Sequence, residues 1–413
     1  MRDITNPRGI RDWATEHRII KRKNIRTMII SPAKRASQVE EYYFSRNNRR
    51  LDAMRKSGID VINLGVGSPD MPPAEKVIST LGESAKLPNV HGYQSYVGIP
   101  ELRQGYSEWY KTWYGVELDP SCEILPLIGS KEGIMHIMMA FINEGDGVLL
   151  PNPGYPTYTS VSKLLGAKIQ YYNLYAENGW QPDFAELEKM DLRGVKIMWT
   201  NYSNMPTGAK ATKELYQRLV RFGREHGIMI CNDNPYSFIL NDNPLSILSV
   251  DGAKDVCIEL NSMSKAHNMA GWRFGMAASS KEVIETVLRV KSNMDSGVFR
   301  PMQMAAVEAL KLGKEWFAKL NAEYRERQRY AFMIMDELGC KYDKEQGGLF
   351  VWAKVDDKWS SAEAQSDEIL AKTGVFITPG FIFGSQGERY LRISLCAKVT
   401  VFEEVLRRIK AMK

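Results

Sequence analysis

Short apolar runs alternate with helical patterns through the middle of the chain. Apolar runs occur at 147–150, 196–200, 228–231 and 256–260, and an amphipathic pattern at 212–226 precedes the third of them. Strands that alternate with helices of about 10–15 residues indicate a mostly parallel sheet covered by helices. The pattern therefore predicts an α/β fold.

Longer helical patterns follow toward the C-terminus. We assign residues 76–310 to a large sheet domain and predict that a smaller α+β lobe joins residues 28–75 to 311–413. The further elements predicted are helices over about 31–58, from Pro100, over 134–142, 281–293, 315–338 and 402–412, and strands at 61–64, 274–278, 348–352 and 390–395.

The charge of this 413-residue chain is concentrated at its start. Residues 1–27 contain eight Lys or Arg against three Asp or Glu, which accounts for five of the six net positive charges. The remainder is close to neutral, which argues against a protein that coats nucleic acid. We interpret residues 1–27 as a poorly ordered basic extension, with a nucleic-acid-binding or membrane-binding arm as the alternative.

Cysteine and histidine spacing excludes other classes of site. The five cysteines form no CxxC pair, and the five histidines show no HExxH spacing. We therefore expect reduced thiols in a cytoplasmic protein and no metal site. No run approaches about 18 uninterrupted apolar residues, so we expect no transmembrane helix.

Polar side chains follow four of the predicted strands, where an open α/β sheet places its ligands. Each residue also has an ordinary interpretation, such as a surface lysine, a helix cap or an Asx turn. The residues concerned are Ser130 and Lys131 at a helix start, the amide Asn204, the carboxylate Asp233 with the phenol Tyr236, and Ser262, Lys265 and Arg273.

One cofactor could interact with all of these groups. Pyridoxal 5'-phosphate (PLP) has an aldehyde for a lysine, a phosphate for a helix N-terminus and a ring nitrogen for a carboxylate. A lysine past a strand end can form a Schiff base when its amine is kept neutral. The four strand ends together therefore indicate a PLP site.

With these motifs in this order, about residues 30–410 resemble fold-type I PLP-dependent enzymes of the class I/II aminotransferase family, which includes aspartate and LL-diaminopimelate aminotransferases. The resemblance implies the PLP-dependent transferase fold, with a mostly parallel central sheet covered by helices and a smaller α+β lobe. It also implies a homodimer with shared active sites, small-molecule substrates, and neither nucleic-acid nor membrane partners.

The resemblance implies a role for each motif residue. Lys265 is the Schiff-base lysine and proton shuttle, and Asp233 is the partner of the ring nitrogen. The cofactor's phenolate oxygen is assigned to Asn204 and Tyr236, its phosphate to Ser130, Lys131 (through its backbone N–H), Ser262 and Arg273, its ring face to Tyr155, and the neighbouring subunit's phosphate to Tyr93. The substrate carboxylate is assigned to Arg392, in a pocket that Gly67 lines.

The chain departs from the family pattern after the strand at 196–200. The family usually has asparagine directly before Pro-Thr-Gly, whereas Met205 stands there in this chain. Counting back from Pro206 places Met205, which cannot donate a hydrogen bond, in the position of the amide. Other members read Asn-x-Pro-Thr-Gly, and we adopt that register, in which Asn204 is the amide.

The predicted activity is transfer of an amino group from an α-amino acid to a 2-oxo acid such as 2-oxoglutarate. Aspartate is the first expected donor, and LL-diaminopimelate, methionine and aromatic amino acids are alternatives. A PLP-dependent β- or γ-lyase or a decarboxylase would use the same motifs. A ligand-sensing regulator would need a DNA-binding module, for which residues 1–27 are too short.

Overall fold

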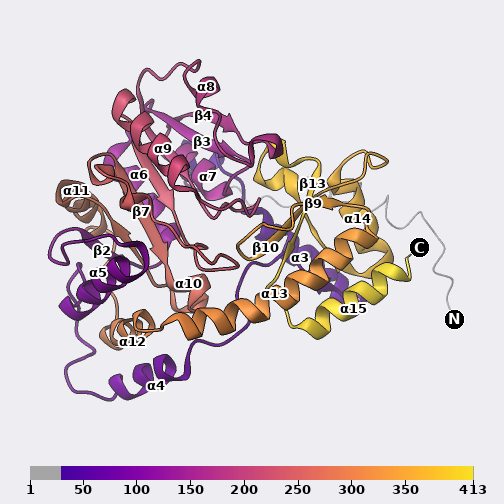
Figure 1. Ribbon diagram of the computed structural model, residues 1–413, viewed down its shortest axis with the longest axis horizontal. Helices are drawn as coiled ribbons and strands as arrows, with labels where there is room; N and C mark the ends of the chain where they lie inside the picture. Colours follow the sequence, from indigo (N-terminus) through magenta and orange to yellow (C-terminus); the bar gives the residue numbers. More distant parts are fainter. Residues whose placement is uncertain (1–28, 413) are drawn as a thin grey trace. The chain divides into compact units, whose positions relative to one another are not determined.

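The computed structural model describes residues 29–412 (Figure 1). The predicted extension, residues 1–27, lies outside the described residues. The chain divides into two units, Met1–Gln38 and Val39–Lys413. The described part of the first unit contains helix α2 (Lys34–Ser37), and every element below belongs to the second.

A seven-stranded sheet forms the centre of the second unit, in the order β2-β8-β7-β6-β5-β3-β4. Strand β8 is antiparallel to both of its neighbours, and the other pairs are parallel. The predicted fold class is therefore confirmed. The strands are β2 (Ile124–Leu127), β3 (Gly147–Asn152), β4 (Lys168–Asn173), β5 (Val195–Thr200), β6 (Met229–Asp233), β7 (Cys257–Ser262) and β8 (Gly275–Ala278).

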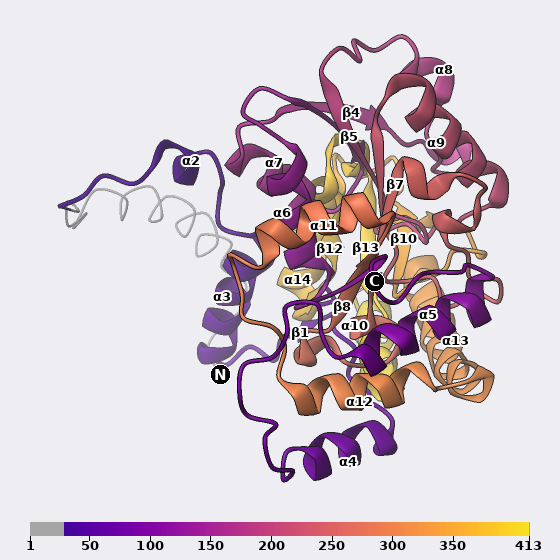
Figure 2. The same cartoon turned by 90° about the vertical axis from the view of Figure 1, so that its left-hand side faces the viewer.

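Helices cover both faces of this sheet, and the burial of alternate residues shows why. Leu149, Met198 and Ile230 belong to one apolar cluster, whereas Val148 and Cys231 belong to another. Strands buried on both faces read as continuous apolar runs, as observed here. Helices α6 (Ser130–Phe141), α7 (Pro156–Leu164) and α11 (Lys281–Lys291) pack on the second cluster, and α5 (Pro100–Tyr114) and α9 (Lys213–His226) on the first; Figure 2 shows α11 beside α6.

Two smaller sheets are formed by the C-terminal part and the segment after α3. One has the order β12-β13-β10-β9, and in the other β1 pairs in parallel with β11. The long helix α13 runs from α12 toward α15 (Figure 1). The elements are α3 (Tyr43–Lys56), β1 (Ile62–Asn63), α4 (Glu75–Ser84), α12 (Arg300–Leu310), α13 (Lys314–Glu337), β9 (Lys341–Tyr342), β10 (Phe350–Lys354), α14 (Ala362–Thr373), β11 (Val375–Phe376), β12 (Thr378–Pro379), β13 (Tyr390–Ser394) and α15 (Val399–Lys410).

The structure differs from the predicted elements near the N-terminus and at the sheet edge. The continuous helix predicted over 31–58 is wrong, because residues 38–42 are not helical. Tyr42 has an extended backbone, with φ −52° and ψ 128°, and its side chain lines a cavity. Strand β4 had no clear signal in the sequence because it is an edge strand with mostly exposed side chains. The division of the chain into a large domain, residues 76–310, and a smaller lobe stays a prediction.

Every helix within residues 29–412 is too short or too polar to cross a lipid bilayer.

Candidate functional site

A cavity of about 330 Å³ lies at the carboxyl ends of β6 and β7. Its wall also includes the loop after β5, the start of α6, residues around the start of α3, and side chains from β10 and β13. Side chains from the large sheet and from the four-stranded sheet therefore meet in one space. The volume suits a small ligand.

Lys265 reaches this cavity from α10 (Met263–Ala266), the short helix that follows β7. Ser262 caps this helix, with its side chain accepting from Ser264 N at 3.1 Å. Burial lowers the pKa of the Lys265 amine, and Arg273 and Arg392 act in the same direction. Its Nζ donates to the carbonyl of Gly67 at 2.6 Å. A lowered pKa favours the neutral amine that can act as a nucleophile.

Asp233 ends β6 and is 4% exposed. Its Oδ2 accepts from the Tyr158 hydroxyl at 3.0 Å, whereas its buried Oδ1 has no protein partner. Burial raises the pKa of this carboxyl to about 7, against opposing effects of Tyr158 and Lys265. A buried acceptor without a partner is costly, so Oδ1 is suited to a cationic N–H group of a ligand.

The start of α6 and the Arg273 guanidinium form an anion site at the cavity wall. Gly129 caps α6 with φ 87°, and no side chain caps the helix, so its first N–H groups are available to a ligand. A Cβ at Gly129 would clash with Arg273. Arg273 Nη1 donates to Ala270 O at 2.8 Å. Ser130, Ser262, Ser264 and Arg273 all line the cavity, which fits a phosphate group.

Arg392 is buried on β13 and has no carboxylate partner among residues 29–412. Its Nη2 donates to Gly65 O at 2.8 Å, its Nη1 contacts the Met205 Sδ at 3.4 Å, and its Nε has no partner. Burial lowers the pKa of the guanidinium to about 10. It lies 3.9, 4.6 and 5.4 Å from the ring centroids of Phe350, Phe383 and Phe44. A buried cation without an anion is suited to a carboxylate ligand.

Close packing explains the glycine at position 67. A Cβ there would lie 2.8 Å from Phe350 Cε1 and closer still to Cζ. Because Phe350 also packs on Arg392, a larger residue at position 67 would displace the ring that supports the guanidinium.

Tyrosines close the remaining walls. Tyr155 and Tyr236 both line the cavity, and burial raises the pKa of each phenol. Tyr155 packs edge-on against Tyr158, with ring centroids 5.5 Å apart. Both phenols therefore stay protonated and can donate.

The structure does not place the loop after β5 as the register chosen from the sequence predicts. Asn204 does not line the cavity, because its Oδ1 accepts from Thr207 Oγ1 at 2.8 Å and its Nδ2 donates to Asn201 O at 3.0 Å. The residues of this loop that line the cavity are Asn201 and Met205. The amide expected at the cavity from Asn204 is thus folded back into its own turn.

Lys131 and Tyr93 are the remaining predicted site residues. Lys131 lines the cavity, and its ammonium lies 4.7 Å from the Tyr42 ring centroid rather than beside a carboxylate. Burial and the nearby Arg273 lower the pKa of Lys131. Tyr93 is 93% exposed and does not line the cavity of its own chain. Its assignment to a neighbouring subunit stays a prediction.

Several aromatic and amide residues that line the cavity were not predicted from the sequence. They lie far apart in the chain and carry no local motif, although Tyr158 lies three residues after Tyr155 on the same helix. The missed residues are Tyr42, Phe44, Asn48, Tyr158, Phe350 and Phe383.

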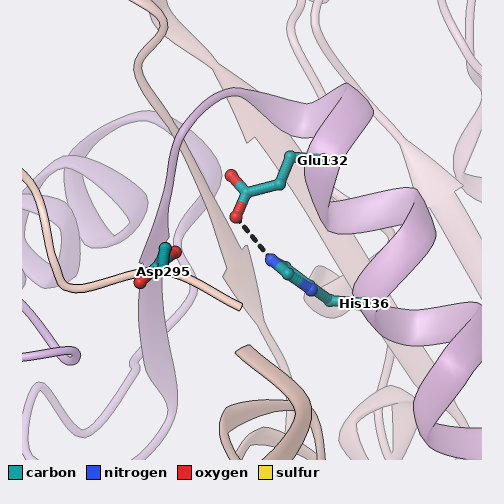
Figure 3. A group of neighbouring side chains, drawn as sticks. All are labelled: Glu132, His136 and Asp295. Carbon is teal, nitrogen blue, oxygen red and sulfur yellow. Dashed lines mark hydrogen bonds and ion pairs between the residues drawn. The ribbon is translucent and has the colours of Figure 1, made fainter. Parts of the chain in front are cut away.

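A second group of polar side chains lies outside the cavity (Figure 3). Glu132 and His136, one turn apart on α6, are hydrogen-bonded, and Asp295 faces them from the segment after α11. Lys291 Nζ lies 2.8 Å from the Asp295 carboxylate and balances its charge. It also donates to Tyr96 O at 3.3 Å, so the group joins α11 to the loop at 92–97.

Comparisons with known proteins agree with this geometry. The family model described as aminotransferase class I and II matches residues 59–409. LL-diaminopimelate aminotransferase of Desulforudis audaxviator is 40% identical over 380 residues, which are 92% of this chain and 97% of the relative. The enzyme of that name from Aquifex aeolicus is 39% identical, covering 90% and 96%. The apo structure of BacF from Bacillus subtilis has a TM-score of 0.88 at 36% identity, covering 93% and 98%.

Proposed function

The chain belongs to the aminotransferase class I and II family, and from this premise we propose that it transfers the amino group of LL-diaminopimelate to a 2-oxo acid such as 2-oxoglutarate. Membership of the family makes it a PLP-dependent transaminase, with amino acids and 2-oxo acids as substrates. The curated relatives favour LL-diaminopimelate, one of the expected alternatives, over aspartate.

The described residues fit the cofactor. The partnerless Oδ1 of Asp233 would hold the proton of the ring nitrogen, and the start of α6 with Arg273 would hold the phosphate. When bound, PLP supplies an electron sink that stabilises negative charge on the Cα of the amino acid. Lys265 Nζ, with its lowered pKa, would take the Cα proton and return it.

Arg392 is the single observation that carries the assignment of an amino acid substrate. Its guanidinium is buried in the same cavity as Lys265 and has hydrogen-bonding capacity left at Nε. A substrate carboxylate would satisfy this cation through charge-assisted hydrogen bonds. It would thereby orient the Cα toward Lys265.

Lys131 supports a donor with a second carboxylate. Lys131 lines the cavity and its ammonium lies 4.7 Å from the Tyr42 ring centroid, and a distal carboxylate would be a stronger partner than this ring. LL-diaminopimelate has an α-carboxylate for Arg392 and a second carboxylate several bonds away. Aspartate also has two carboxylates, but they are close together.

The experiment measures glutamate formation from 2-oxoglutarate with LL-diaminopimelate, aspartate, phenylalanine or alanine as donor. We expect kcat/KM for LL-diaminopimelate to exceed the others by about tenfold or more, the effect of one charged hydrogen bond. Lys131→Gln keeps the backbone N–H and should reduce kcat/KM for LL-diaminopimelate while changing little for alanine, which serves as the matched control. A preference for aspartate or phenylalanine would contradict the proposed donor.

We also propose the oligomeric state, the domain boundaries and the cellular compartment of the protein. Tyr93, at 93% exposure, supports a homodimer in which this side chain reaches the partner's site. The large domain would comprise residues 76–310, and the small domain residues 28–75 with 311–413. All five cysteines are free, which supports a reducing compartment such as the cytoplasm.

A further inference from the structure

Met205 is part of the cavity wall and lies beside the buried guanidinium of Arg392. It is 5% exposed, lines the cavity and has its Sδ 3.4 Å from Arg392 Nη1. A thioether is a weak acceptor and cannot donate a hydrogen bond. The wall therefore presents a side chain that cannot donate beside the Arg392 cation, in the same cavity as Lys265.

Of the two neighbouring amides of this loop, Asn201 lines the cavity and Asn204 does not. Asn204 is folded into its own turn. Asn201 is fixed by two backbone contacts, because its Nδ2 donates to Asp233 O and its Oδ1 accepts from Met205 N at 2.7 Å. The orientation of the Asn201 amide toward a ligand is thus set by these backbone contacts and does not depend on the side chain at position 205.

Tyr236 is a phenol of the cavity wall that lies near both Lys265 and Phe350. Its ring centroid lies 5.9 Å from Lys265 Nζ and 5.9 Å from the Phe350 ring that packs on Arg392. A protonated phenol can donate one hydrogen bond to a negative oxygen beside Lys265. In PLP, the ring oxygen is on the carbon next to the one that bears the aldehyde, so it lies beside the lysine nitrogen once the two are joined.

We propose that Met205 is a positioning residue that withholds a hydrogen-bond donor from the ring oxygen of the cofactor, so that the proton on Lys265 Nζ is retained to higher pH. The inference rests on the proposed function, because it requires the cofactor on Lys265. A donor would stabilise the negative oxygen and weaken its hold on the neighbouring proton. With methionine at position 205, the oxygen shares that proton more strongly with Lys265 Nζ.

The consequence is a site that remains protonated at Lys265 over a wider pH range. An amine substrate exchanges with the lysine most readily when the lysine linkage is protonated, because the carbon under attack is then electrophilic. Met205 would therefore favour the first exchange step at alkaline pH.

The test is a pH titration of the absorbance of the holoenzyme, without substrate, for three forms of the protein. Met205→Asn introduces a shorter side chain that ends in an amide, and Met205→Leu is the control of similar volume that is also unable to donate. We expect the midpoint of the long-wavelength band to fall by about one pH unit in Met205→Asn, the effect of about one hydrogen bond to a charged group. In Met205→Leu it should stay within about 0.3 units of the natural protein.

Equal midpoints in all three proteins would overturn the proposal, as would a shift in Met205→Leu as large as that in Met205→Asn. Lys265→Ala separates this failure from failure of the proposed function. If the natural protein shows no band that depends on Lys265, the cofactor assignment fails. If the band is present but does not respond to the amide, only the role of Met205 fails.

Discussion

Replacing Arg392 by methionine separates the contribution of this arginine to substrate binding from its contribution to folding. Two charged hydrogen bonds to a substrate carboxylate, at about 1.5–3 kcal/mol each, amount to about 3–6 kcal/mol. We therefore expect kcat/KM for every amino donor to fall by about 10²- to 10⁴-fold. Steady-state kinetics with saturating 2-oxoglutarate measure this loss.

The expected effect of Arg392→Met on stability is small. Burial lowers the pKa of the guanidinium from 12.5 to about 10, which corresponds to about 3 kcal/mol against the buried cation. The three aromatic rings oppose this cost, at about 0.5–2 kcal/mol each. Methionine fills a similar volume, so the free energy of unfolding in urea should change by less than about 1 kcal/mol.

Arg389 provides the matched control, because it lies just before β13 and donates to the backbone oxygens of Trp359 and Asp356. Arg389→Met should lower stability and leave kcat/KM nearly unchanged. The reasoning would be refuted by an Arg392→Met protein that loses more than about 3 kcal/mol of stability yet keeps its kcat/KM, the behaviour of a broken internal ion pair.

Three further predictions concern the rest of the site. In cofactor-free protein, the raised pKa of Asp233, about 7, means that its contribution to stability is present below pH 4 and is lost as pH rises through 7. Asp233→Asn should therefore gain about 2–3 kcal/mol in unfolding free energy relative to the natural protein between pH 5 and pH 8, and a pH-independent difference in urea unfolding would contradict this cause. Gly67→Ala should lower stability by about 1–3 kcal/mol through overlap with Phe350 and reduce activity, whereas Gly82→Ala, with open space around it, should do neither in thermal unfolding and kinetic assays. Mixing inactive Lys265→Ala and Tyr93→Ala subunits should restore about a quarter of the natural activity if Tyr93 acts across a dimer, and no restoration after verified subunit exchange would rule this out.

The central sheet was predictable because its strands are buried on both faces. Leu149, Met198 and Ile230 face one cluster while their neighbours in sequence face the other, so each strand reads as an unbroken apolar run. Edge strand β4 gave no such signal, since one face is open to water. The break before α3 was equally hidden, because Tyr42 leaves the helical pattern to line a cavity that also includes residues far along the chain, such as Arg392.

Site residues were predictable where they lie at or just after the end of a strand. They were not predictable within a loop whose side chains form hydrogen bonds to the loop itself. Asp233 ends β6, Lys265 lies in the short helix after β7, and both line the cavity as expected. Between Thr200 and Gly208, the direction of each side chain depends on hydrogen bonds within the loop that spacing does not reveal. Asn204 satisfies its own turn and Met205 faces Arg392.

Two residues of the cavity wall, Lys131 and Met205, carry the proposed specificity and pH dependence. In their proposed roles, Lys265, Asp233 and Arg392 would contact only groups that all amino acids and the cofactor share, and these three residues line one cavity. Lys131 and Met205 line the same cavity, so we expect substitutions there to change the preferred donor or the protonation of Lys265. Differences among relatives in donor and pH dependence should therefore follow positions 131 and 205 more closely than the strand-end residues.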